Sequence, residues 1–165
     1  HYATMADVQK AVIEAAEDLY RAYIKREIAS GKYTAYRAKG MAYIKFAREE
    51  KELFKLLFMR DRSQERTKEN PQENDLPTGL IEKQTGIDRA SATTFCLEMW
   101  AYTHGIAALI ATDYLSWDED LSSRALTDVY EGLKNKHGGA TDEKSIGKLD
   151  KNRTKTRIKK ETKTI

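Results

Sequence analysis

The residues from Thr93 to Thr112 form an apolar run of twenty positions that contains a single charged residue, Glu98. The rest of the chain is very different, since Asp, Glu, Lys and Arg make up 33% of all residues. A helix that is apolar nearly all round cannot face water over much of its surface. The run therefore predicts a central helix that is enclosed by its own domain or shared with a second subunit.

A transmembrane helix is the first alternative, because a run of this length could cross a bilayer. Two features argue against it. The flanks are acidic, whereas membrane helices usually end in basic or aromatic anchors. The run also contains several polar residues: Thr93, Thr94, Glu98, Thr103, His104 and Thr112. We therefore expect no contact with a membrane and interpret the run as the central helix of an all-helical domain.

Length and charge limit the organisation of the chain. Its 165 residues are enough for one domain with its own core. Residues 138–165 contain nine Lys or Arg and four Asp or Glu, while the whole chain carries +3, so the preceding body is mildly acidic. We predict a helical domain over residues 4–137 and a basic, disordered tail over 138–165. The basic balance of the whole chain does not make the folded part a nucleic-acid binder.

Cysteine content bears on the compartment. The single Cys96 excludes an internal disulfide framework and is compatible with a reducing environment. We therefore expect a cytoplasmic protein. Within the apolar run, Cys96 is interpreted as a small buried hydrophobic residue.

Capping signals and apolar spacing divide the domain into helices. Capping boxes are predicted at Thr4–Asp7 and Ser116–Glu119, and Asp88 is predicted to cap the central helix. The charged segment 61–77 holds both prolines and predicts a mobile connection. No strand pattern is visible. We predict about six helices, near residues 4–30, 34–49, 53–59, 79–84, 88–114 and 116–137.

The second of these helices has two predicted faces. Tyr36, Gly40 and Tyr43 lie on its inward stripe, together with Ile44 and Ala47. The opposite face is predicted to meet water. Its basic residues are Arg37, Lys39, Lys45 and Arg48.

Catalytic and metal-binding patterns are absent from the sequence. His1, His104 and His137 are far apart, and the His and Glu spacings of helical metal sites do not occur. Cys96 and His104 are eight residues apart on one helix, which separates them by roughly 12 Å. We therefore expect neither an enzyme nor a cofactor.

His104 and Gly105 are the most informative pair in the apolar run. His104 has two interpretations: a core histidine bonded across a helix interface, or a residue that faces a ligand or a second subunit. Gly105 costs about 1 kcal/mol relative to Ala inside a helix, which indicates that close approach compensates for it. A row of small residues at helical spacing would allow such an approach: Ala101, Gly105, Ala108 and Thr112.

Many aromatic residues accompany this helix, and most are expected in the core. Bulky rings and tyrosine hydroxyls around short helices do not pack densely with ease. A cavity lined by rings with a few polar groups is what an apolar small-molecule site requires. The expected ligand-binding residues are Tyr43, Phe46, Phe54, Phe58, Phe95, Met99, Trp100, Tyr102 and His104.

Three segments, taken in order, resemble the C-terminal regulatory half of TetR-type transcriptional repressors, in the subgroup named for a Trp-His-Gly motif. The first is His1-Tyr-Ala-Thr-Met-Ala-Asp-Val8. The second comprises Ala42-Tyr-Ile-Lys-Phe-Ala-Arg48 and Leu53-Phe-Lys-Leu-Leu-Phe-Met-Arg60. The third is Met99-Trp-Ala-Tyr-Thr-His-Gly-Ile-Ala-Ala-Leu109, followed by Trp117-Asp-Glu-Asp and a final amphipathic helix. The resemblance covers residues 1–137.

The resemblance implies an all-α regulatory domain of about six helices that dimerises through a four-helix bundle. It also implies a pocket for a small-molecule effector, whose binding would shift the helix over residues 4–30 and change operator binding. The family's N-terminal helix-turn-helix is missing except for a remnant in residues 1–3. Operator DNA is therefore expected to be bound only through that absent domain.

The sequence supports the homodimer independently. The apolar stripes and the small-residue row offer more inward surface than a helical body of this size can cover. The expected contact residues are Ala101, Gly105, Ala108, Leu126, Val129, Tyr130 and Leu133. The alternative is a purely structural helical dimerisation or interaction module with a filled core and no ligand pocket.

Overall fold

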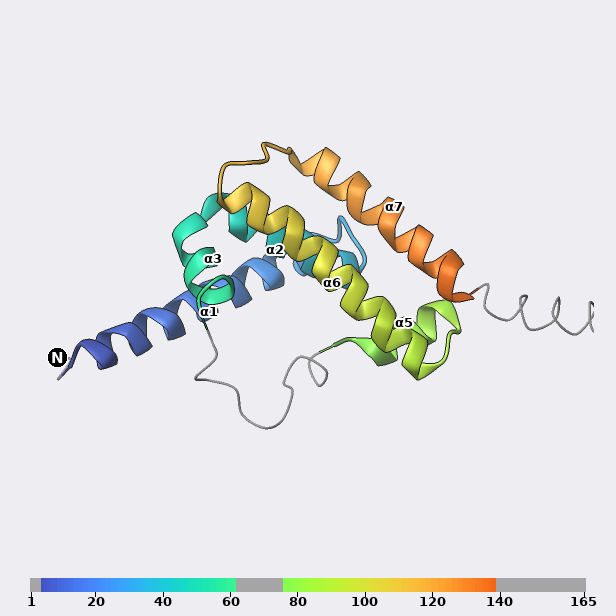
Figure 1. Ribbon diagram of the computed structural model, residues 1–165, viewed down its shortest axis with the longest axis horizontal. Helices are drawn as coiled ribbons and strands as arrows, with labels where there is room; N and C mark the ends of the chain where they lie inside the picture. Colours follow the sequence, from blue (N-terminus) through green and yellow to red (C-terminus); the bar gives the residue numbers. More distant parts are fainter. Residues whose placement is uncertain (1–3, 62–75, 139–165) are drawn as a thin grey trace, which may run out of the picture.

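The computed structural model describes residues 4–61 and 76–138, and all of its regular elements there are helices (Figure 1). The helices are α1 (Met5–Ala29), α2 (Ala35–Glu49), α3 (Lys51–Phe58), α5 (Thr78–Thr85), α6 (Arg89–Ala111) and α7 (Glu119–Gly138). The all-α prediction is confirmed. The predictions for residues 1–3, for most of the 61–77 connection and for the tail beyond 138 lie outside the described residues.

Two of the three predicted helix caps form as expected. The Thr4 hydroxyl accepts a hydrogen bond from Asp7 N at 3.2 Å, and Asp7 Oδ2 accepts one from Thr4 N at 2.9 Å, which completes a capping box. Asp88 Oδ1 accepts from Ser91 N at 3.0 Å and caps α6. Both caps satisfy backbone donors that a helix start leaves free.

The predicted capping box at Ser116–Glu119 is wrong. Helix α7 begins at Glu119, and the carboxylate of Asp118 accepts a hydrogen bond from Leu121 N at 2.8 Å. The cap is thus two residues later than Ser116. Glu119, the expected second member of the box, instead pairs with Lys32 at 2.6 Å across the fold.

The ends of three helices follow from backbone conformation. Gly31 and Gly86 adopt positive φ values of 65° and 74° after α1 and α5, a region that glycine enters without steric cost. Helix α6 ends at Ala111, before the predicted end near Tyr114, because Asp113 turns the chain with a φ of 59°.

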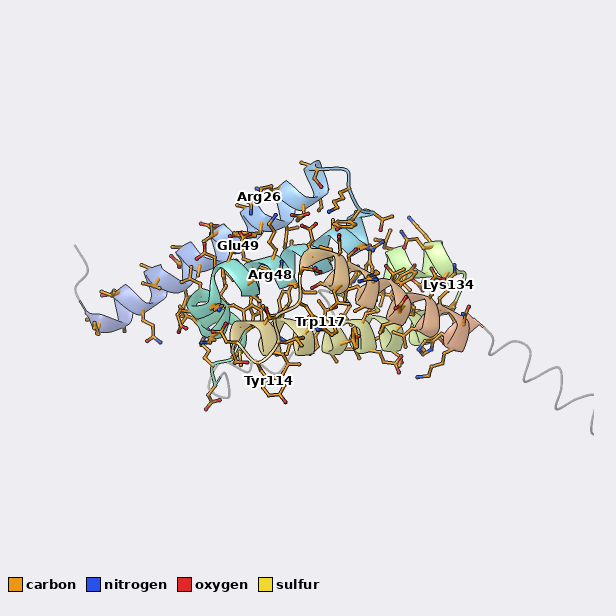
Figure 2. The ribbon with its side chains drawn as sticks, turned by 90° about the horizontal axis from the view of Figure 1, so that it is seen from above. Arg26, Arg48, Glu49, Tyr114, Trp117 and Lys134 are labelled. Atoms are coloured by element: carbon orange, nitrogen blue, oxygen red, sulfur yellow. The ribbon has the colours of Figure 1, made fainter. Side chains whose placement is uncertain are left out.

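Helices α6 and α7 run side by side, with α2 packed against both of them (Figure 1). Helix α5 lies against α6, and α1 packs against α2 and α3 through its C-terminal half. The N-terminal half of α1 projects from the body of the molecule (Figures 1 and 2). Its side chains are correspondingly exposed, as Met5 (82%) and Val12 (44%) show.

The core is aromatic where α1, α2 and α3 meet. The ring of Tyr43 lies 5.8 Å from Tyr20, 5.1 Å from Phe54 and 4.8 Å from Phe58, between centroids. Phe46 and Phe54 are fully buried there. Edge-to-face and tilted pairs at these distances add to the free energy gained by burial.

Two arginines of α2 that were predicted to face water instead bind the chain around α7. Arg37 Nη2 donates to the carbonyl oxygen of Ser123, and Arg48 Nη2 donates to that of Trp117, each at 2.9 Å. Figure 2 shows Arg48 beside Trp117. Sequence spacing alone does not show that a neighbouring segment brings carbonyl groups within reach of a guanidinium.

Both faces of α6 are apolar, but neither it nor another helix of residues 4–61 or 76–138 meets the length and hydropathy needed to span a membrane. Its buried residues alternate with partly exposed ones, so the helix is only half enclosed within the single chain.

Candidate ligand-binding cavity

A cavity of about 790 Å³ lies between α2, α6 and α7 and extends to the C-terminal half of α1 and the end of α3. Its volume falls within the range of sites for drug-sized molecules. The lining residues are Tyr20, Lys32, Tyr33, Thr34, Tyr36, Arg37, Lys39, Gly40, Tyr43, Phe58, Leu76, Pro77, Gln84, Cys96, Leu97, Met99, Trp100, Thr103, Leu126, Thr127, Tyr130 and Glu131.

One part of the wall is made of three packed rings, from Tyr20 of α1, Tyr43 of α2 and Phe58 of α3. Tyr20 lies 5.3 Å from Phe58 and 5.8 Å from Tyr43, between ring centroids. A ligand in contact with these rings would touch three helices at once. The wall therefore brings side chains of α1, α2 and α3 to the same cavity.

Helix α6 contributes residues at helical spacing. Cys96, Met99 and Thr103 are buried and line the cavity. The Thr103 hydroxyl donates to the Met99 carbonyl oxygen at 2.7 Å, so its methyl group is left for the cavity side and for α2. Trp100, which is 46% exposed, also lines the cavity and therefore lies where the cavity meets solvent.

Gly40 of α2 lies close to Leu126 of α7. A Cβ atom added at Gly40 would lie 3.2 Å from Leu126 Cδ1 and 3.9 Å from Thr103 Cγ2. The first distance is shorter than ordinary van der Waals contact. A larger residue at this position would therefore displace Leu126, which itself lines the cavity.

Burial keeps the buried tyrosine hydroxyls and the cysteine thiol of the cavity neutral. It raises the pKa values of the Tyr20, Tyr36 and Tyr43 hydroxyls above the ordinary tyrosine range. It also raises the pKa of the Cys96 thiol to about 11, so the thiolate is not populated near neutral pH. The expectation that Cys96 is a small buried residue is confirmed by its 2% exposure.

His104 lies behind the cavity wall. Its Nδ1 is 2.8 Å from the Tyr43 hydroxyl, and its ring stacks on Trp100 with centroids 5.3 Å apart. Desolvation lowers the pKa of His104, which favours the neutral imidazole. Of the two interpretations left open by the sequence, the arrangement matches a histidine bonded across the α2–α6 interface. It positions Tyr43 and Trp100, which both line the cavity.

The cavity includes four of the nine residues expected from sequence to bind a ligand: Tyr43, Phe58, Met99 and Trp100. The other five do not line it. Phe46, Phe54 and Phe95 are fully buried in the core. Tyr102 lies on the outward side of α6, and His104 acts through its neighbours.

Sequence reasoning missed most of the α2 and α7 side of the cavity. Tyr36 and Gly40 had been placed on the inward stripe of α2, which was the available signal, but they were not assigned to the ligand site. Leu126 and Tyr130 were assigned to a subunit contact instead. Only the packing of α7 over α2 turns these residues toward a common space.

The residues expected at a subunit contact fall into two groups. Ala101 and Gly105 are exposed and Ala108 is partly exposed, so this row of α6 is available to a partner. Val129, Tyr130 and Leu133 are partly buried against the chain's own core. Leu126 does not fit the expectation, because it is 3% exposed and faces the cavity.

Large apolar side chains surround the exposed row on α6. Leu97 (37%), Trp100 (46%), Tyr102 (37%) and Leu109 (41%) are all well exposed in the single chain. Contiguous apolar surface of this kind is rare on monomeric proteins and is typical of an interaction site.

Over residues 4–61 and 76–138, no group of three His, Cys, Asp or Glu side chains is placed to hold a metal ion.

Comparison with known proteins gives one match. No curated protein and no solved structure matches the chain significantly. A family model for the tetracyclin repressor-like C-terminal domain matches residues 36–130, which is more than half of the chain and spans α2 through most of α7. The matched segment contributes all lining residues of the cavity except Glu131 and those from α1 and the α1–α2 connection. The chain belongs to the tetracyclin repressor-like C-terminal domain family.

Proposed function

We propose that this chain is the effector-sensing and dimerisation domain of a TetR-type transcriptional repressor, and that it binds a small apolar or aromatic molecule. Membership of a repressor-like family fits a regulatory rather than a catalytic role. The cavity of about 790 Å³ is the observation that carries the proposal. A filled helical core would leave no such space.

The proposed mechanism couples the cavity to α1. Tyr20 borders the cavity and packs against Tyr43, Phe46 and Phe58. A ligand that displaces the Tyr20 ring would shift α1, whose N-terminal half extends away from the body (Figure 1). In the complete regulator this helix would lead from an N-terminal DNA-binding domain. The effector must then prefer the conformation that does not bind the operator.

The proposed homodimer uses the outward face of α6 together with α7. The two helices lie side by side, so two copies related by a two-fold axis would form a four-helix bundle. The exposed row of Ala101, Gly105 and Ala108 would let two backbones approach closely. The same apolar face also favours the second candidate function, a structural dimerisation module that binds no effector.

A ligand screen separates these two functions. Thermal unfolding of the purified chain is followed with a panel of neutral apolar and aromatic compounds. A true effector site gives saturable stabilisation, about 2.7 kcal/mol at a ligand concentration one hundred times Kd. The compounds that stabilise are then titrated by calorimetry.

A matched pair of variants locates the binding. Met99→Trp adds a large ring within the cavity and is expected to abolish or strongly weaken binding, while circular dichroism confirms that the variant folds. Met59→Trp makes the same change at a residue that is 43% exposed and outside the lining. It should bind like the parent chain. Equal binding by both variants, or no stabilisation by any compound, would favour the structural module.

A further inference from the structure

We propose that the effector of this cavity is an amphipathic anion, with an apolar or aromatic body and an acidic headgroup held by Arg37 and Lys39. The inference rests on the proposed function, since it names the chemical class that the same cavity would take. It follows from the charges at the edge of the cavity and from which of them already have partners.

Four charged residues line the cavity, and two of them are already paired. Lys32 Nζ lies 2.6 Å from Glu119 Oε1, and Tyr33 also donates to that oxygen at 3.0 Å. Glu131, the single acidic residue of the lining, lies 3.9 Å from Lys134. Each of these pairs has one positive and one negative charge. The net charge at the cavity edge therefore comes from Arg37 and Lys39.

Arg37 is held in place without being neutralised. Its Nη2 donates to the carbonyl and hydroxyl oxygens of Ser123, which carry no charge, and its guanidinium lies 5.0 Å from the centroid of the Tyr33 ring. Its Nε is shielded from solvent and has no hydrogen-bond partner. A guanidinium fixed in this way keeps a positive charge at the cavity that no carboxylate neutralises.

Lys39 is the second cation. It is exposed, lines the cavity and makes no hydrogen bond or ion pair with any residue of 4–61 or 76–138. Its long side chain starts one residue before Gly40, where α2 lies close to Leu126 of α7. A compact ammonium on a flexible stem can follow a headgroup at the cavity edge while the body of the ligand lies among the rings.

A cationic effector is the opposing possibility, because aromatic walls attract cations. The charges at the edge disfavour it. The single carboxylate of the lining is paired with Lys134, whereas two cations have no carboxylate partner within the described residues. The geometry therefore selects an acid over an amine.

Calorimetric titration with two matched trios of compounds tests the proposal. The aromatic trio is 2-naphthoate, 2-naphthylmethanol and 2-naphthylmethylammonium; the linear trio is octanoate, 1-octanol and octylammonium. Within each trio the body is shared and the headgroup charge changes. We expect the anion to bind roughly tenfold to a hundredfold more tightly than the alcohol, the range for a hydrogen bond to a charged group.

Four variants assign the preference to its residues. Lys39→Met and Arg37→Met should each remove at least tenfold of the anion's affinity and leave that of the alcohol nearly unchanged. Lys25→Met removes the same charge from an exposed residue of α1 outside the lining and should change neither. Because Arg37→Met also removes a bond to Ser123, Arg37→Lys is added as a variant that keeps the charge and should retain part of the preference.

The outcomes separate this proposal from the proposed function. If the alcohol or the ammonium binds as tightly as the anion, the anion preference is refuted while the effector cavity stands. The same holds if the preference survives both Met variants. If no member of either trio binds, the anion proposal also fails. The proposed function fails only if the broader neutral panel gives no stabilisation as well.

Discussion

Helix α6 has two apolar faces that differ in what covers them. The inward face carries Phe95, Cys96, Met99 and Thr103, all buried against the chain's own helices. The outward face carries small residues such as Ala101 and Gly105 between large side chains that remain well exposed. The inward face therefore builds a core and a cavity wall, whereas the outward face stays uncovered in the single chain and is the face that the proposed homodimer would cover.

Among substitutions that distinguish the two faces of α6, Ala101→Arg is expected to have the largest effect. A guanidinium at the centre of a two-fold interface is buried unpaired from both copies, and an uncompensated buried charge costs about 3–5 kcal/mol. We expect a folded monomer at micromolar concentrations, measured by light scattering after size-exclusion chromatography. Ala22→Arg, at an exposed alanine of α1, should leave the mass unchanged. A dimer that persists in Ala101→Arg would place the interface elsewhere.

The next effect is on the inward face. Phe95 is fully buried, with its ring 5.2 Å from that of Tyr130. Phe95→Ala should lower the free energy of unfolding by about 3–5 kcal/mol, because it removes buried apolar area and leaves a void. The free energy of unfolding is measured by chemical denaturation, at a protein concentration where the chain is monomeric. Leu109→Ala, at a residue 41% exposed on the outward face, should then cost less than about 1 kcal/mol. Equal costs would mean that the two faces are covered alike.

A smaller effect is expected at Gly105, where a Cβ atom meets nothing within 4 Å in the single chain. Gly105→Ala should stabilise the monomer by about 1 kcal/mol, since alanine favours the helix. In the dimer the methyl group should push the partner away and weaken association. Gly79→Ala, on α5 and outside the proposed contact, is the control, since a Cβ atom there would meet only Glu82 Oε2 at 3.9 Å. Stabilisation without any change in the dissociation constant would argue that no helix lies over Gly105.

The smallest effect concerns the link between α6 and the end of α7. Glu98 lies 2.6 Å from Lys136 Nζ and 2.8 Å from His137 Nε2, and these hydrogen bonds lower the pKa of Glu98. Because the folded pKa is depressed, the stabilisation is present above the ordinary carboxyl pKa of about 4.3 and is lost as pH falls through the lower folded value.

Glu98→Gln should therefore lower stability at pH 7 by about 1 kcal/mol or less, as for other exposed pairs. Between about pH 5 and pH 3, the free energy of unfolding of the variant should also fall less than that of the parent chain. Urea denaturation at each pH measures it. An unchanged acid profile in the variant would show that Glu98 does not contribute to it.

Some features of the fold were predictable because their causes are local. The Thr4–Asp7 box and the Asp88 cap each need only a side chain and a backbone donor three residues away. The glycine ends of α1 and α5 need only one residue with positive φ. The cap of α7 was predicted at Ser116 but is formed by Asp118, because several polar residues in a short stretch can each serve as a cap.

The cavity was predicted only in part because its position depends on how helices cross. Tyr43, Phe58, Met99 and Trp100 were identified, since rings and Met at inward positions favour a cavity. Phe46 and Phe54 have the same chemistry and the same periodicity, yet they fill the core. Which of these residues reach the cavity depends on how the helices pack together, and no local pattern encodes that packing.

The sequence by itself determined the helical class, the helix limits set by local caps and glycines, and a central helix too apolar to stand alone in water. Local hydrogen bonds and periodicity suffice for these features. Tertiary structure alone decided which face of α6 borders the cavity, that Leu126 lies inside and that Arg37 turns toward Ser123. These choices depend on contacts between residues far apart in the chain, where side-chain shape rather than hydrophobicity selects the arrangement.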